Sequence, residues 1–196
     1  MAQPSQSLQS SAQLTEDGSS DSWSYRDPKA DVTKYKAFIV EPTVVSTDPE
    51  AKWGKVSEGD KQKYADLFTT ALKSELGKSY SLATEKGPGV GVIRLTLLGV
   101  KPASAIAVAT KVTPIGFALT SVKSMAGKPG SFSGSAQVAF ELMDSQSGEL
   151  VAAAIRRKSP DALDIGASTS TDGTIAAIAK DSASAIRAGL DKANGK

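Results

Sequence analysis

The sequence lacks two residue types altogether, since its 196 residues contain no histidine and no cysteine. Without histidine, the chain has neither the side chain that titrates near neutral pH nor the commonest nitrogen ligand of metals. A Ser–His–Asp triad is excluded, and metal-dependent hydrolysis is disfavoured. Without cysteine, no disulfide framework and no thiolate nucleophile can form, although any redox compartment is compatible with that. We therefore expect a protein that is not an enzyme and that has no catalytic residue, no cofactor and no metal site.

Aromatic side chains and net charge are also low. Aromatic residues make up 6% of the chain and glycines number 17, so the core is expected to consist of small and aliphatic side chains. The 23 basic and 21 acidic residues give a formal charge of +2, too small an excess to indicate nucleic-acid binding. No apolar run approaches the roughly 20 residues of a membrane-spanning helix. Hydrophobic residues at 40% are typical of a soluble globular protein.

The first residues predict a segment that stands apart from the folded domain. The opening MAQPSQSLQS has neither the basic stretch nor the apolar stretch of a signal peptide. Residues 1–24 are rich in Ser and Gln and poor in apolar side chains, which favours a flexible polar leader or tether. Residues 25–196 are then expected to form a single domain.

Hydrophobic periodicity predicts the elements of that domain. Ser57 is a good helix N-cap, apolar residues recur behind it at helical spacing, and Gly77 is placed to end the helix as a C′ glycine. The turn from Asp144 to Gly148 joins two strands and predicts a hairpin. A second helix is expected over residues 174–192. The remaining expected strands are 35–45, interrupted by Pro42, then 79–84, 91–101, 135–144 and 149–157.

This order predicts the fold class. The succession β-α-β-β-(insert)-β-β-α indicates an α+β domain, a two-layer sandwich in which two helices pack on one face of a mixed sheet of about five strands. Sequence alone does not identify a catalytic pair in it. Asp144 and Glu149 flank the hairpin turn, where Asp is favoured because its side chain bonds the nearby backbone. The glycines from Gly87 to Gly91 lead into a strand, whereas a phosphate-binding loop leads into a helix.

The insert at residues 102–132 is the most unusual part of the sequence. It is apolar, yet too short and too divided by lysines and a proline to span a bilayer. One interpretation is a hydrophobic flap that binds a partner, a lipid or a second subunit. The other is a cover that buries itself on the other face of the sheet. The candidate interaction surface in this insert consists of Ile106, Val108, Val112, Ile115, Phe117 and Leu119.

A basic cluster closes the last predicted strand, at Arg156, Arg157 and Lys158. It could meet phosphate, a lipid head group or an acidic partner. The alternative interpretation is a solvated strand end. Arg156 and Arg157 complete the candidate interaction surface.

Four segments, taken in order, resemble a known family. They are SYRDPKADVTKYKAFIVEPTVV (24–45), KVSEGDKQKYADLFTTALKSEL (55–76), KGPGVGVIRLTLLGVKPAS (86–104) and SAQVAFELMDSQSGELVAAAIRRK (135–158). The ordered set is similar to the DUF3313 family of bacterial envelope lipoproteins of unassigned function, over about residues 22–192. The resemblance implies an export signal that ends in a lipid-modified cysteine, a polar tether and one periplasmic domain. It carries over no catalytic residue.

The start of this sequence departs from the family pattern, because Met1 and Ala2 precede the polar leader directly and no signal or cysteine is present. We expect that the signal and the anchoring cysteine were replaced, and that the native form is periplasmic and lipid-anchored, with the outer membrane favoured. A native Met1 would instead favour the cytosol. The expected function is a non-enzymatic domain that binds another envelope component, a protein or a glycan. The alternative is a carrier of a lipid or apolar small molecule that uses residues 104–126 as a lid. A homo-oligomer is compatible with both.

Overall fold

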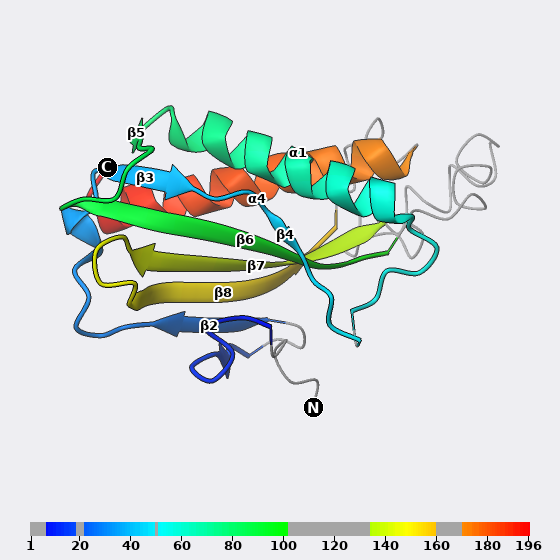
Figure 1. Ribbon diagram of the computed structural model, residues 1–196, viewed down its shortest axis with the longest axis horizontal. Helices are drawn as coiled ribbons and strands as arrows, with labels where there is room; N and C mark the ends of the chain where they lie inside the picture. The colour runs from blue at the N-terminus through cyan, green and yellow to red at the C-terminus, as the bar shows by residue number, and fades with distance from the viewer. Residues whose placement is uncertain (1–6, 19–21, 50, 102–133, 160–169) are drawn as a thin grey trace.

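The computed structural model of the chain describes residues 7–18, 22–49, 51–101, 134–159 and 170–196. In these residues, a mixed sheet of eight strands carries two helices on one face (Figure 1). This confirms the predicted α+β class. The strand count is higher than the five that the sequence predicts, because the single predicted strand at 35–45 is divided and two strands come from the predicted leader region.

The eight strands vary from two to twelve residues in length. They are β1 (Thr15–Glu16), β2 (Trp23–Arg26), β3 (Ala37–Val40), β4 (Val44–Val45), β5 (Ser81–Leu82), β6 (Val90–Lys101), β7 (Ser135–Asp144) and β8 (Leu150–Lys158). Their order in the sheet is β1-β2-β8-β7-β6-β3-β5, with β4 also paired to β6. The long strands β6, β7 and β8 form antiparallel pairs, whereas β3 and β4 run parallel to β6. Pro42 lies between β3 and β4, because a residue without an N–H cannot continue the ladder.

Two capped helices cover one face of the sheet. Helix α1 spans Glu58–Leu76, and the Ser57 hydroxyl accepts a hydrogen bond from the Asp60 amide at 3.1 Å, which confirms the predicted cap. The helix ends at Gly77 as predicted, but Gly77 is its C-cap with a right-handed φ of −59° and not a C′ glycine, which usually adopts a left-handed conformation. Helix α4 spans Thr171–Ala193 and begins three residues before the predicted position, because Ser170 caps it through the Gly173 amide.

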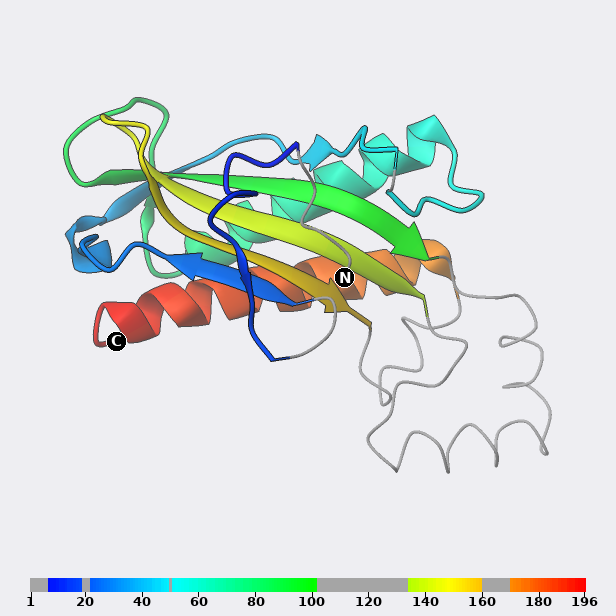
Figure 2. The same ribbon diagram turned by 90° about the horizontal axis from the view of Figure 1, so that it is seen from below.

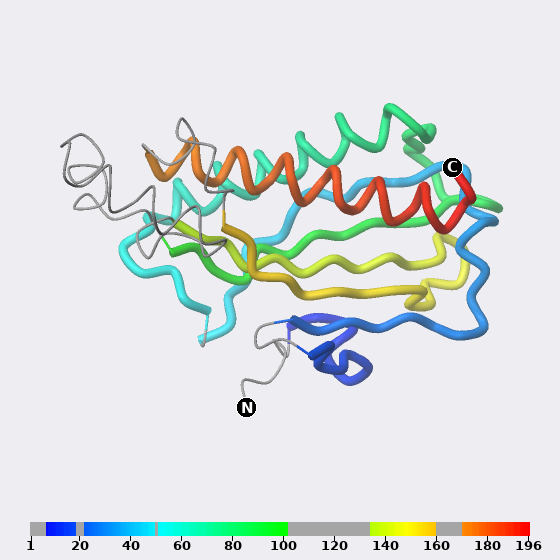
Figure 3. Tube along the Cα trace, turned by 180° about the vertical axis from the view of Figure 1, so that it is seen from behind, coloured from blue at the N-terminus to red at the C-terminus, as the bar shows by residue number. Residues whose placement is uncertain are grey.

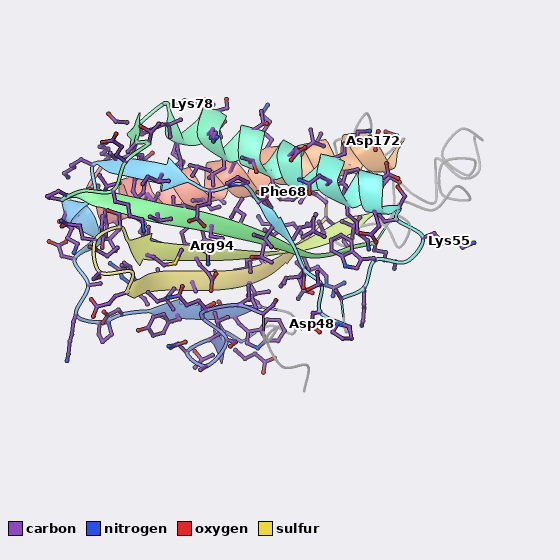
Figure 4. The ribbon with its side chains drawn as sticks, in the orientation of Figure 1. Asp48, Lys55, Phe68, Lys78, Arg94 and Asp172 are labelled. Atoms are coloured by element: carbon purple, nitrogen blue, oxygen red, sulfur yellow. The ribbon has the colours of Figure 1, made fainter. Side chains whose placement is uncertain are left out.

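The main core lies between the helices and the sheet. Its fully buried members come from both layers and include Phe38, Phe68, Leu72, Ile93, Leu97, Leu142, Ile175 and Ile178. Figure 4 labels Phe68 where α1 meets the sheet. The predominance of aliphatic side chains agrees with the low aromatic content of the sequence. At the hairpin between β7 and β8, the Asp144 carboxylate accepts hydrogen bonds from the amides of Gln146 and Ser147, which confirms the predicted turn role of this aspartate.

The N-terminal segment, residues 7–18, packs on the face of the sheet opposite the helices. Figure 2 shows it crossing the strands. Leu8 and Leu14 are 4% and 8% exposed and form a second apolar cluster with Trp23 and residues of β6, β7 and β8. The Ser10 amide donates to the buried carboxylate of Glu141 at 2.7 Å. The prediction of a flexible leader is therefore wrong for these residues, since two leucines and one charge-assisted hydrogen bond offset the ordering entropy of a polar segment.

Candidate functional site

A groove lies between α4 and the part of the sheet formed by β7, β8 and β2. Its volume is about 400 Å³. The two helices pack against one another and α4 contacts β7, whereas β2 lies on the side of the long strands away from the helices (Figure 3). The groove exists because two helices do not cover the full width of this sheet.

Strands β7 and β8 supply the apolar floor of the groove. Side chains alternate between the two faces of a strand, so every second residue faces the helix layer. On this face the floor residues are Val138, Phe140, Leu142, Ala152 and Ala154. The two alanines are small where larger residues would reach α4.

Helix α4 supplies the opposite wall through a second set of small and aliphatic residues. They are Ala185, Ile186, Gly189, Leu190 and Ala193. Ala185, Gly189 and Ala193 recur every four residues and so share one face of the helix. A Cβ atom placed on Gly189 would meet no heavy atom within 4 Å, which shows that the groove is open at this position.

Three cationic side chains line the groove, and no carboxylate does so among the described residues. Arg156 donates to the Trp23 carbonyl oxygen and to the Asp17 carboxylate, each at 2.7 Å. Lys158 pairs with Asp181 at 2.7 Å. Arg26 lies exposed at the end of β2 and pairs with no carboxylate in the described part of the chain. Among the described residues, it is therefore the groove cation that is left available to a ligand.

The pairing of Arg156 also orders the N-terminal segment. The Ser22 hydroxyl, followed by the charge and hydrogen bond of Arg156, lowers the pKa of Asp17, although partial desolvation opposes this shift. Asp17 therefore remains ionised at neutral pH and holds the guanidinium. Arg156 thus lines the groove and also holds the N-terminal segment through its ion pair with Asp17.

The structure separates the basic cluster that the sequence singles out. Arg156 and Lys158 contribute to the groove, whereas strand alternation places the exposed Arg157 on the opposite face. The other six candidate residues lie outside the described residues, as does the insert: Ile106, Val108, Val112, Ile115, Phe117 and Leu119. Sequence reasoning missed Arg26 and the α4 wall. The recurrence of small residues at 185, 189 and 193 was a visible signal for the wall, but no local pattern connects Arg26 to β8.

Two polar clusters at the ends of the helix pair have a structural role. At one end, Lys78 and Arg187 both pair with the buried Glu75. Both lower the pKa of Glu75, and the effect of Lys78 is the larger. At the other end, Asp172 on α4 accepts from Lys63 and from the Tyr64 hydroxyl on α1. Burial and this hydrogen bond raise the pKa of Tyr64 to about 12. Figure 4 labels Lys78 and Asp172 at opposite ends of the helix pair, so each cluster fixes one end of α4 against α1.

The described residues contain neither a cluster of metal ligands nor a helix suited to cross a membrane. Within the ranges that the structure describes, no three or more carboxylates gather closely enough to hold a metal ion. Across those same ranges, neither helix combines the length and the apolar character that crossing a bilayer requires.

The solved structures that match this chain share little sequence with it. A variant PelC dodecamer from Paraburkholderia phytofirmans is 9% identical, with a TM-score of 0.47, and the match covers 86% of this chain and 95% of that one. A DUF4136 family protein from Bacteroides thetaiotaomicron is 13% identical, with a TM-score of 0.40 and the same coverage of the two chains. A hypothetical protein from Chlamydia trachomatis is 11% identical, with a TM-score of 0.41, over 83% of this chain and 99% of that one.

One protein family matches the sequence over most of its length. No curated protein matches the sequence. The family model of DUF3313, described as a protein of unknown function, matches residues 3–186. The match covers most of the chain, including all eight strands and helix α4 as far as Ile186. It agrees with the resemblance that the ordered segments indicate. The chain therefore belongs to the DUF3313 family.

Proposed function

We propose that this protein is a non-enzymatic binding domain of the bacterial cell envelope and that its ligand occupies the groove beside α4. The observation that carries the proposal is the groove itself, an open apolar space of about 400 Å³. Ligand sites in proteins have volumes of roughly 300–1,000 Å³, apolar walls and a few polar groups. The groove fits each of these criteria.

The polar groups at the groove favour binding over catalysis. An arginine does not lose its proton in proteins, so neither Arg26 nor Arg156 can act as a general base. The Lys158 ammonium group already pairs with the Asp181 carboxylate at 2.7 Å. Ser182 has no histidine to activate it, because the sequence contains none. The described lining therefore supplies charge and shape without a proton acceptor suited to catalysis.

The envelope location is part of the proposal and follows from the family resemblance. We expect the native gene product to fractionate with the outer membrane and to carry a lipid on a cysteine upstream of the residues shown here. Metabolic labelling with radioactive palmitate, followed by membrane fractionation, tests this directly. A product that stays unlabelled and remains in the soluble cytosolic fraction would contradict the location.

Site-specific photo-crosslinking in intact cells tests the groove. A diazirine amino acid replaces Ser182 in the groove lining, and a control replaces the exposed Lys55 in the loop that precedes α1 (Figure 4). Gly189→Leu fills the groove, whereas the matched variant Gly189→Ala adds one methyl group in open space. We expect a discrete adduct at Ser182 that persists with Gly189→Ala and is lost with Gly189→Leu. Adducts at Ser182 that are the same in all three backgrounds would overturn the proposal.

A further inference from the structure

The groove has cations near both ends and an apolar wall between them. Arg26 lies opposite Ala152 in the register of β2 and β8, and Lys158 lies six residues further along β8. At about 3.3 Å per residue, these positions are roughly 20 Å apart. The wall between them is formed by alanine, valine, leucine, isoleucine, phenylalanine and glycine. A complementary ligand is long, apolar over most of its length and negatively charged at an end.

We infer that the groove binds an amphipathic anion, a single acyl chain with a carboxylate or phosphate head group at Arg26. This inference rests on the proposed function and gives its ligand class. Arg26 is the head-group position because the other two cations already hold Asp17 and Asp181. A head group at Arg26 would gain a charge-assisted hydrogen bond without displacing an existing carboxylate.

An acyl chain fits the walls better than a peptide does. The floor is the face of a sheet whose inner strands are already paired on both sides, and the other wall is a helix with its own backbone bonds. An extended peptide in the groove would leave its N–H and C=O groups without partners, and a buried polar group without a partner is destabilising. A methylene chain has no such groups and gains from every contact with the apolar walls.

A glycan is also a poor match for this lining. Sugar hydroxyls need many hydrogen-bond partners, because a polar group that is buried without one is destabilising. Ser182 is the sole uncharged polar side chain that the described residues contribute to the groove. The same lining is suitable for hydrocarbon.

Binding of defined amphiphiles to the full chain tests the inference. The probes are myristate, myristoyl-lysophosphatidate and the uncharged tetradecanol, each below its micellar concentration, measured by native mass spectrometry and calorimetry. We expect one equivalent of each anion to bind and tetradecanol to bind at least tenfold more weakly. Arg26→Gln should weaken the anions about tenfold, and Arg26→Lys should restore most of the affinity. A preference for myristate indicates a fatty acid as the source, whereas a preference for lysophosphatidate indicates a phospholipid.

The groove variants separate this inference from the proposed function. Gly189→Leu should abolish binding of both anions and Gly189→Ala should retain it, while thermal melts show that both variants are folded. Equal binding of tetradecanol and the anions, or no effect of Arg26→Gln, would overturn the inference. If no probe binds, or if the Ser182 adduct is a peptide, the inference fails; the proposed function still holds if the adduct is sensitive to Gly189→Leu.

Discussion

The packing of the N-terminal segment on the sheet predicts how much stability the substitution Leu14→Ala should remove. Leu14 is 8% exposed and packs in the second apolar cluster, on the sheet face opposite the helices. Leu14→Ala removes three carbon atoms from this cluster, at about 0.8 kcal/mol for each buried carbon. The expected loss is about 2 kcal/mol, at the lower end of the range for core leucines, because a surface segment relaxes more easily than a core does.

This loss should appear as local opening and not as global unfolding. The segment is attached by the Ser10 amide on Glu141, by the ion pair of Asp17 with Arg156 and by its two leucines. Such a segment can detach while the helices and the long strands stay folded. Since 1.4 kcal/mol corresponds to a factor of ten, Leu14→Ala should accelerate exchange of the Ser10 amide hydrogen by roughly 30-fold.

Native-state hydrogen exchange measures this opening at each amide. The Ser10 amide and the Leu14 amide, which donates to the Ser10 carbonyl oxygen at 3.1 Å, should be protected in the unmodified protein. Leu82→Ala is the matched control, because Leu82 is 45% exposed and its truncation should leave both amides unchanged. Exchange of Ser10 and Leu14 at the rate of an unstructured peptide, with or without Leu14→Ala, would refute the docking of this segment.

Three further predictions concern stability. In the unmodified protein, stability should fall between pH 10 and 12, because the pKa of Tyr64 is raised from 10.0 to about 12 in the folded state and the unfolded chain ionises first. Tyr64→Phe should reduce this loss by on the order of 1–2 kcal/mol, which urea unfolding at pH 8 and 11 checks. Glu75→Gln should lower the urea midpoint at pH 7, and the difference should shrink as the pH falls below 4.5, since Lys78 lowers the pKa of this carboxyl. Gly99→Ala should destabilise the fold by about 1–3 kcal/mol in thermal melts, because its Cβ would lie 2.9 Å from the Lys52 carbonyl oxygen; an unchanged melt would contradict this packing.

The sequence predicts those elements whose signals are local. Ser57 caps α1 through an amide three residues away, and the Asp144 turn bonds its own backbone, so a short window of sequence contains both partners. Pro42 interrupts its strand for an equally local reason, the missing N–H. Long strands add a second signal, because alternation over ten residues makes the side-chain pattern visible.

The elements that the sequence misses depend on distant partners. Strand β2 has four residues, too few for a pattern, and it becomes a strand by pairing with β8 about 130 residues later. Leu8 and Leu14 are two apolar residues in a polar stretch, and their burial depends on a sheet face that forms elsewhere in the chain. Some residues of the groove can likewise be predicted from local sequence, and others cannot. Alternation predicts that Arg156 and Lys158 share a face, whereas the position of Arg26 follows from the β2–β8 register.

The whole-chain charge and the local charge lead to different conclusions about ligands. A formal charge of +2 argues against an extended surface for a polyanion such as nucleic acid, which needs many cations on one face. It does not exclude recognition of a single anionic group, since one cation beside an apolar wall is sufficient for that. In the groove, Arg156 and Lys158 are already neutralised by Asp17 and Asp181, and Arg26 remains. The arrangement therefore suits one negative charge joined to a long apolar chain, because a second charged group would have to displace a carboxylate that already stabilises the fold.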